Sequence, residues 1–438
     1  MKIISKLTLA LLLGSVAIVP ATYAAKEKEA KPAANAAPKL KPTPGFIKAY
    51  GPANDALEKK KDFALAKSLL PAVKAAAVND DDRYVAGSFA INLGAQSKDL
   101  AVQKEGIELL LASPITPAAN KPVYIFQLGA IAYDAKDYPA AEVFLKQAFD
   151  AGYKQGNTAI LTSNALSQQK KYSEAQTWLR KGIDATIASG EKAQPTWYVQ
   201  GAAYAIKAKD NAASTIWLKD VVRADPQPKY WHDALIVYSN GSNLDLAENL
   251  DLLRLLRLTG SMTYEQDYSL YVESADARRY PTEVKSVLDE GFAKGVISRK
   301  NITFAESYAA ASGLVAEDVR TLATIEAPAR ASASPYQAVL AADAFLSNGN
   351  YAKAKELYEL ALSKGKIIDK AGADQTARVL TRLGMSKVGV GDLAGAKTEF
   401  AKIQTGNRKV IAEYWTIFVD HKMEPAVVAA PAPAPTAK

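Results

Sequence analysis

Two short helices with small residues inside their apolar stripes are the feature that most constrains this fold. In segment 126–149, FQLGAIAYDAKDYPAAEVFLKQAF, apolar residues recur at helical spacing on either side of a Lys-Asp-Tyr-Pro turn. Such spacing places them on one face of an α-helix. Pro139 suits the first turn of the second helix, where its missing N–H is not needed. Gly129 and Ala141 leave room for a neighbouring helix, so the segment predicts a closely packed helical hairpin.

The same pattern recurs along most of the chain. An alanine followed four residues later by a large apolar residue occurs at Ala66/Leu70, Ala141/Leu145, Ala175/Leu179, Ala213/Trp217, Ala354/Tyr358 and Ala396/Phe400. From Ala141 onward the spacing of successive alanines is 34, 38 and 34 residues when Ala247 is included. No sustained period-two strand pattern appears. One hairpin cannot cover its own apolar stripes, so the chain is expected to be an all-α array of stacked hairpins.

This pattern resembles the tetratricopeptide repeat, a helix-turn-helix unit of 34 residues. The fullest match is W-x2-Q-G-x2-Y followed by A-x3-W, from Trp197 to Trp217. The resemblance implies a right-handed α-solenoid of helical hairpins. Units are expected at 46–73, 122–150, 157–183, 195–226, 335–365 and 377–403, with degenerate units at 83–112, 230–256 and 264–295. In one degenerate unit Asp251 stands where the large apolar residue belongs.

Composition divides the rest of the chain. Lys2 and Lys6 precede an apolar run that ends in small residues up to Ala24, which predicts a signal peptide and a periplasmic or secreted protein. The run is shorter than the roughly 20 residues that span a bilayer, which argues against an uncleaved anchor. The expected organisation is a signal peptide at 1–24, a disordered Lys/Ala/Pro linker at 25–45, a repeat array at 46–300, an irregular helical connector at 301–334, repeats with a capping helix at 335–422, and a disordered Ala/Pro tail at 423–438.

Charge and cysteine content limit the classes of partner. The net charge is +8, but much of the excess lies in the predicted signal peptide and linker, so the body is nearly balanced and is not expected to bind nucleic acid. The chain has no cysteine, which removes disulfides and thiolate metal sites. No further segment reaches spanning length, so no transmembrane segment is expected in the mature chain.

The resemblance also implies where a partner would bind. In the family, the first helices of successive hairpins line a concave wall that holds a peptide or a partner protein. By repeat spacing, the candidate groove residues are Phe126, Gln127, Tyr133, Asn164, Tyr198, His232 and Asp233. The alternative for each of these is packing between adjacent hairpins. Some members clamp a carboxylate with Lys and Asn, but that clamp is unsupported here, and Arg378 and Arg382 are interpreted as solvated surface arginines.

Motifs for catalysis are weak. His232 and His421 are the only histidines, so a His-rich zinc site is excluded, and no metal site, cofactor or catalytic residue is expected. Glu306-Ser307 followed by segment 311–314 looks like fragments of a lytic transglycosylase, although the spacing is too short. We therefore predict a non-catalytic scaffold in envelope assembly or secretion. The alternatives are a transglycosylase-like murein enzyme, or an accessory protein for polysaccharide binding or export.

Overall fold

The computed structural model describes residues 40–154 and 158–424, which are helical almost throughout. They form two compact units that divide between Ile125 and Phe126. The predicted signal peptide, most of the linker and nearly all of the Ala/Pro tail lie outside the described residues. Within the described residues no strand forms, and the only β-type pairing is a bridge between Ile368 and Asp374. The all-α prediction is therefore confirmed.

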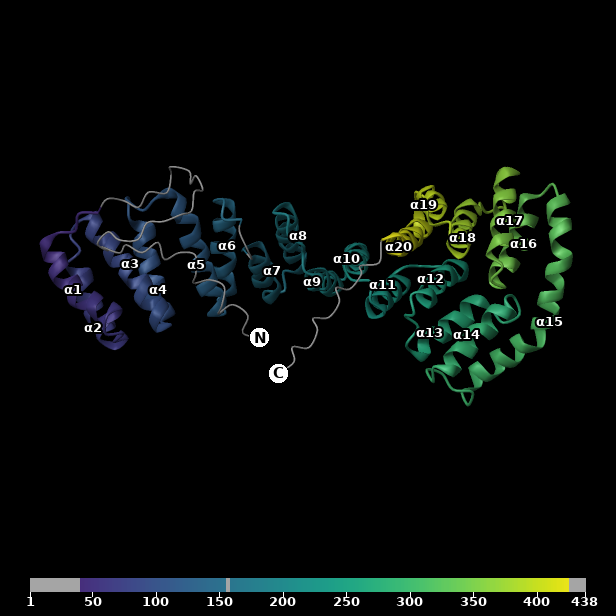
Figure 1. Ribbon diagram of the computed structural model, residues 1–438, viewed down its shortest axis with the longest axis horizontal. Helices are drawn as coiled ribbons and strands as arrows, with labels where there is room; N and C mark the ends of the chain where they lie inside the picture. Colours follow the sequence, from purple (N-terminus) through teal and green to yellow (C-terminus); the bar gives the residue numbers. More distant parts are fainter. Residues whose placement is uncertain (1–39, 155–157, 425–438) are drawn as a thin grey trace, which may run out of the picture. The chain divides into compact units, whose positions relative to one another are not determined.

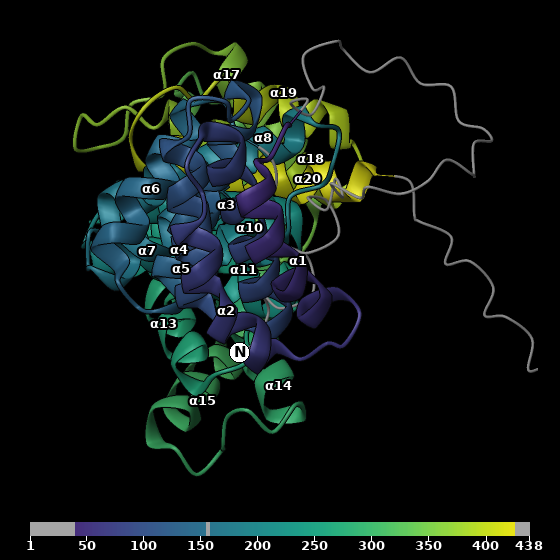
Figure 2. The ribbon, with the colours of Figure 1, turned by 90° about the vertical axis from the view of Figure 1, so that its left-hand side faces the viewer.

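The first unit contains two hairpins that pack on each other (Figure 1; Figure 2). It comprises α1 (Pro44–Glu58), α2 (Phe63–Ala75), α3 (Asp80–Ser97), α4 (Leu100–Ala112) and a 3₁₀ turn, η1 (Ala118–Asn120). The end of the predicted linker is ordered here: Thr43 caps α1, and its backbone N–H donates to the carboxylate of Asp82 at 2.8 Å. The helix α5 (Lys121–Asp134) carries the boundary between the units.

The second unit continues the hairpins and ends in a single helix. Its helices are α6 (Tyr138–Asp150), α7 (Thr158–Gln168), α8 (Tyr172–Ala188), α9 (Pro195–Lys207), α10 (Asn211–Ala224), α11 (Pro228–Gly241), α12 (Leu246–Leu258), α13 (Glu265–Ala275), α14 (Pro281–Ala293), α15 (Ile302–Ala331), α16 (Pro335–Ser347), α17 (Tyr351–Ser363), α18 (Thr376–Gly389), α19 (Leu393–Ala401) and α20 (Gly406–Met423). Each helix packs against its neighbours in sequence, as a solenoid requires.

Seven of the hairpin turns share one backbone conformation. At the end of α5 the Asp137 N–H donates to the Ala132 carbonyl at 2.9 Å, while Lys136 takes a φ of 63°. This is a Schellman closure of the first helix. The Asp137 carboxylate then caps α6 by accepting from the Ala140 N–H at 3.2 Å. Lys61, Lys98, Lys170, Lys209, Gly349 and Gly391 take the same left-handed conformation before the second helix of their hairpins.

Small residues let the two helices of a hairpin meet closely. A Cβ added to Gly129 would lie 2.7 Å from Leu145 Cγ, and one added to Gly201 would lie 2.4 Å from the Trp217 ring. Both contacts are between the first and second helix of one hairpin. Ala141 is fully buried at the same α5–α6 contact. The Gly and Ala positions of the repeat therefore set the distance between helices within each hairpin.

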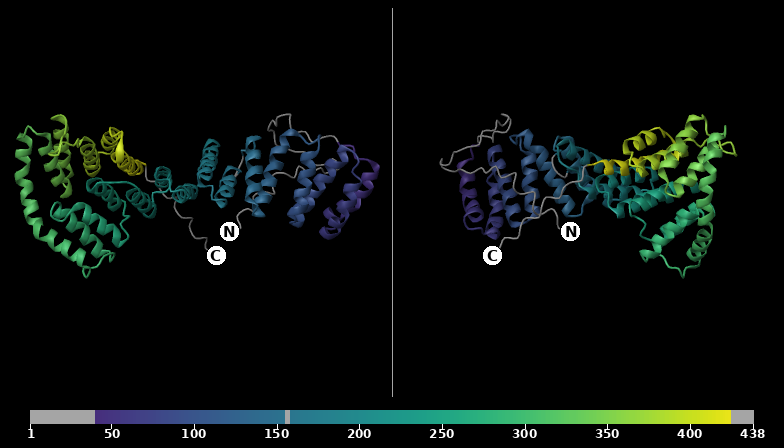
Figure 3. Two further views of the ribbon diagram at one scale, coloured as in Figure 1. Left: turned by 180° about the vertical axis from the view of Figure 1, so that it is seen from behind. Right: turned by 45° about the vertical axis from the view of Figure 1, so that its right-hand side comes forward.

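The C-terminal helices of the second unit return to its middle. Segment 301–334, expected to be irregular, is dominated by the single 30-residue helix α15. After it, α16 to α19 form two more hairpins, and α20 packs against α10, α12, α18 and α19 (Figure 1; Figure 3). One hydrophobic core joins residues of α7 to α14 with residues of α18 to α20. The solenoid in this unit therefore closes on itself.

Candidate functional site

Two of the predicted groove residues pack inside their own hairpin. The Phe126 and Tyr153 rings lie 4.9 Å apart at the centroids, and the Tyr133 and Tyr138 rings meet edge to face at 5.5 Å. Both Phe126 and Tyr133 remain half-buried. Burial raises the pKa of Tyr133, and the neighbouring Tyr138 raises it further. Gln127 is half-buried too, and its Oε1 has no hydrogen-bond donor among the described residues.

Two others bond to the next hairpin. Asn164 Oδ1 on α7 accepts from Gln200 Nε2 on α9 at 2.5 Å. His232 Nε2 on α11 lies 3.1 Å from Asp267 Oδ1 on α13, and the His232 ring lies 4.8 Å from that of Tyr264.

The remaining two candidates are more open. Tyr198 is half-buried beside the main core, and burial raises its pKa. Asp233 is exposed. The seven candidates are thus distributed along α5, α7, α9 and α11, and their role in binding stays a prediction.

A buried charge network joins the middle of the second unit to its C-terminal helices. Asp251 on α12 is fully buried, and its carboxylate contacts Arg254 at 2.8 Å and Arg382 on α18 at 3.0 Å. Arg408 on α20 also pairs with this carboxylate. Burial acts to raise the pKa of Asp251, but the guanidinium groups of Arg382, Arg408 and Arg254 outweigh it and hold that pKa well below its usual range. Asp251 is therefore the ionic centre of the closure.

The arginines expected at the surface belong to this network. Arg382 is 1% exposed, and its guanidinium also reaches the Asp343 carboxylate on α16 at 2.7 Å. Arg378 is buried as well and pairs with the same carboxylate, to which Tyr358 donates at 2.6 Å. The interpretation of Arg378 and Arg382 as solvated surface residues is therefore wrong. Arginine at these helical positions is buried because α12 and α16 each bring a buried carboxylate to α18.

A cavity of about 830 Å³, open to solvent on one side, lies between helices of the closed part of the second unit. Its apolar side chains come from the ends of α12 and α16, the start of α17, and helices α18 to α20: Leu258, Leu346, Tyr351, Met385, Val388, Leu393, Trp415 and Phe418. Its polar side chains come mainly from α12 and α14, with Lys422 from α20. These residues are far apart in the sequence, so no local motif predicts the cavity.

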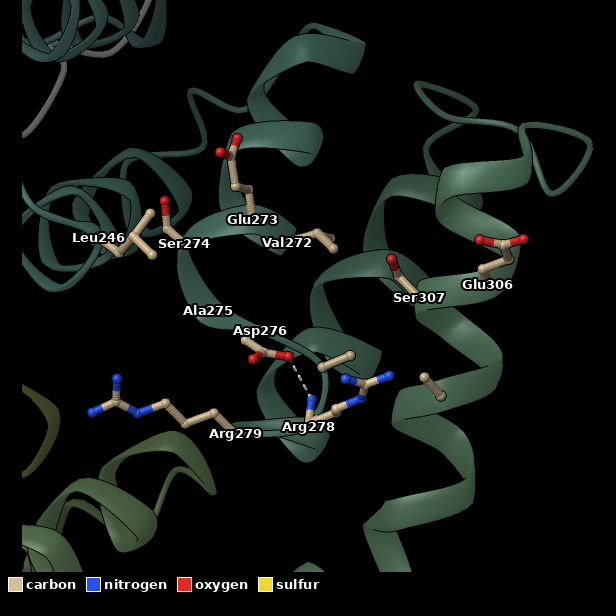
Figure 4. A pocket seen from close by; sticks show the side chains of 12 residues that line it. Leu246, Val272, Glu273, Ser274, Ala275, Asp276, Arg278, Arg279, Glu306 and Ser307 are labelled. Carbon is tan, nitrogen blue, oxygen red and sulfur yellow. Dashed lines mark hydrogen bonds between the residues drawn. The ribbon is translucent and has the colours of Figure 1, made fainter.

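A second, smaller hollow of about 450 Å³ lies between α13, the loop that follows it, and α15 (Figure 4). Glu306 and Ser307 of α15 line it together with Glu273 and Asp276. The Glu306 side chain is exposed. Glycoside hydrolysis needs a carboxylic acid with a raised pKa, which burial among apolar groups provides. The surroundings of Glu306 therefore give the transglycosylase alternative no support.

The hairpin of α16 and α17 matches a known protein family. Residues 338–363, inside the predicted unit at 335–365, match the tetratricopeptide repeat. Six other hairpins, α1–α2, α3–α4, α5–α6, α7–α8, α9–α10 and α18–α19, close with the same left-handed turn. Residues 338–363 thus form a tetratricopeptide repeat, and the described hairpins make a tetratricopeptide-like array. No curated protein sequence matches it.

Two solved structures are similar to this tetratricopeptide-like repeat protein, each at 14% identity. The similarity to the apo form of RapI spans 64% of this chain and 97% of the RapI chain, with a TM-score of 0.28. The similarity to the TPR2AB domain of yeast Sti1, in a complex with pHSP90, spans 69% of this chain and 97% of the Sti1 chain, with a TM-score of 0.21. Scores this low describe no shared overall arrangement, so the assignment rests on the matched hairpin and on the repeated turns.

Tetratricopeptide-like repeats suggest a scaffold for protein–protein interaction. Within 40–154 and 158–424, none of the helices combines the length and the hydropathy needed to cross a bilayer. Over the same residues, no cluster of His, Asp and Glu side chains is arranged to hold a metal ion.

Proposed function

We propose that this protein is a non-catalytic scaffold that works outside the cytoplasm and binds a peptide or partner protein on α5, α7, α9 and α11. Half-buried aromatic and amide side chains on the first helices of successive hairpins carry the proposal: Phe126, Gln127, Tyr133, Asn164 and Tyr198. Mixed side chains of this kind give large contact areas and hydrogen bonds to a partner. The predicted signal peptide supports a role in the cell envelope, in assembly or secretion.

Partner capture tests the proposed surface. Crosslinking in an envelope extract, followed by mass spectrometry, identifies bound proteins, and pull-down then measures their recovery by each variant. The variant Tyr133→Ala plus Tyr198→Ala should recover the captured partner poorly while keeping wild-type helicity. Tyr308→Ala plus Tyr336→Ala is the matched control, because both rings are half-buried on α15 and α16, away from the proposed surface. Equal recovery by the two double variants would exclude the groove.

Zymography on peptidoglycan tests the non-catalytic part of the proposal. We expect no cleared band for the wild-type protein, because Glu306 is exposed and no buried acid lies beside it in the hollow between α13 and α15. A cleared band that disappears in the Glu306→Gln variant would show murein cleavage and would replace the scaffold with the enzyme alternative.

A further inference from the structure

The cavity inside the closed part of the second unit has the size of a ligand site. Its volume of about 830 Å³ lies within the range of roughly 300–1,000 Å³ that is typical of pockets for small molecules and cofactors. The helices around it are held together from several directions by the charge network of Asp251, Arg382 and Asp343. A cavity with walls fixed in this way is formed before any ligand arrives.

The apolar wall leaves hydrophobic surface in contact with water. Leu258 is 51% exposed and Tyr351 is 39% exposed, although both line the cavity. Trp415 and Phe418 are nearly covered and close the α20 side of the same wall. An apolar ligand placed here would remove this surface from water, which favours binding in proportion to the area covered.

The polar side chains that line the cavity already form hydrogen bonds and ion pairs with one another. Arg254 bonds to both oxygens of Glu283 at 2.8 and 2.7 Å, and Arg257 bonds to Glu290 and to Ser286 at 2.8 Å. An apolar ligand can therefore lie beside these groups without leaving a buried charge unpaired.

The same bonding disfavours an extended peptide. Thr282 donates to Asp318 at 2.6 Å, and the Asn348 amide donates to Asp318 and to the Ala344 carbonyl, each at 3.0 Å. A peptide brings one N–H and one C=O for nearly every residue, and each of these needs a partner when it is buried. Few donors and acceptors of this wall are free to serve them. The wall suits a ligand with a long body that carries no polar groups.

One cation among the cavity residues has no acidic partner. Lys422 is exposed to solvent, its Nζ lies 5.5 Å above the Phe418 ring, and no carboxylate of the described residues lies within ion-pairing distance of it. Arg254 and Arg257, the other two cations of the lining, are both paired with glutamates. A single anionic group beside Lys422 would therefore complete the charge pairing of the cavity.

We propose that this cavity binds a small amphipathic monoanion of the fatty-acid class, with its apolar body against Leu258, Tyr351 and Trp415 and its head group at Lys422. The inference does not depend on the proposed protein-binding surface, because the cavity and that surface share no residue. A ligand here would bridge α12 and α20, and so would stabilise the closed arrangement of the second unit.

Calorimetric titration of the full mature chain with dodecanoate tests the proposal. The wild-type protein should bind dodecanoate. The Leu258→Glu variant should bind it at least about tenfold more weakly, because a charge would then face the apolar body. Val319→Glu is the matched control: Val319 is 52% exposed on α15, does not line the cavity, and its variant should bind like the wild type. Circular dichroism shows whether both variants keep their helices.

The head group is tested with a neutral analogue. Lys422→Glu should weaken dodecanoate binding several-fold and leave dodecanol binding unchanged, because only the anion pairs with Lys422. Absence of dodecanoate binding to the wild type, or equal affinities for Leu258→Glu and Val319→Glu, would overturn the proposal. So would binding of an apolar peptide without dodecanoate binding. Partner recovery in the pull-down is a separate readout, so either proposal can fail alone.

Discussion

Arg382 carries a charge that is almost completely removed from water and lies between two carboxylates. Its guanidinium contacts Asp251 and Asp343, which belong to helices separated from it by 131 and 39 residues of sequence. Burying such charges is costly unless they are paired and hydrogen-bonded, and removing one partner leaves the others uncompensated. The network therefore makes the position of α18 depend on both α12 and α16.

Replacement of Arg382 tests this dependence. Arg382→Met should lower the free energy of unfolding by about 3–5 kcal/mol, because it leaves Asp251 and Asp343 with fewer cations in a buried site. The substitution Arg320→Met should change the urea midpoint little, because the Arg320 side chain is 74% exposed and pairs only with its neighbour Glu317. Similar midpoints for the two variants would mean that the buried network does not hold the helices.

The same network predicts a dependence on pH. The pKa values of Asp251, Glu283 and Asp343 are depressed: burial alone would raise them, but the adjacent guanidinium groups outweigh it. A depressed carboxyl pKa contributes stability above the unfolded value, about 4, and this contribution is lost as pH falls toward the folded value. The free energy of unfolding should therefore drop from about pH 4 downward. Asp251→Asn should show a shallower drop in pH-dependent urea unfolding, and parallel curves would contradict this account.

Gly129 tests the packing of a hairpin. Gly129→Leu should destabilise the protein by about 1–3 kcal/mol, because even a Cβ at this position would press on Leu145. Gly313→Leu is the control, since Gly313 lies in α15 with nothing within 4 Å of an added Cβ. There the exchange should be neutral or slightly stabilising, because leucine favours helix more than glycine does. Equal thermal midpoints would show that the α5–α6 contact is not tight.

At the level of single residues the sequence was informative where the pattern was local. The roles of Gly129 and Ala141 follow from helical spacing, because both contacts lie within one hairpin. The roles of Asp251 and Arg382 do not, because their partners come from distant helices and charged residues on helices are usually solvated. Asp251 did break the repeat pattern, and that irregularity was the one signal of the network in the sequence.

The helix α15 differs from every other helix of the second unit. It has 30 residues, but only Phe304, Ala311 and Ala329 are buried, two near its start and one near its end. Leu314 and Val319 in its middle are exposed, and this part of the helix is held mainly by Asp318, which accepts from Thr282 on α14 and from Asn348 just after α16. The loss of the repeat pattern in 301–334 predicted an interruption, but helical periodicity alone did not show that one helix bridges it.

Hydrogen exchange should distinguish α15 from its neighbours. Amides at 312–322 should exchange faster than those of α16, because few buried contacts oppose local opening of a helix segment. In α16, Ala338, Val339 and Ala342 are fully buried and should protect their segment. Mass spectrometry of peptides from both helices measures this directly, and equal protection would mean that another part of the chain covers the middle of α15.

At the scale of the whole molecule, each compact unit consists of stacked hairpins. In the second unit the C-terminal helices also pack back onto the middle of the unit. An open solenoid needs only contacts between neighbours, which the repeat pattern can predict. The closure places α20 against α10 and α12, and the interface includes Lys219 and Glu413 with their charged atoms 2.5 Å apart. No repeat rule specifies such a contact. For this reason the sequence predicted the hairpins but missed both the closure and the cavity that lies between its helices.

Cysteine crosslinking tests the closure most directly, because the chain has no native cysteine. The variant Lys219→Cys plus Glu413→Cys should form an intrachain crosslink with a short bis-maleimide. Lys146→Cys plus Glu174→Cys, which joins successive hairpins whose charged atoms lie 3.2 Å apart, is the positive control. A crosslink in both variants is the predicted result. A crosslink in the control alone would contradict the closure of α20 onto α10 and α12.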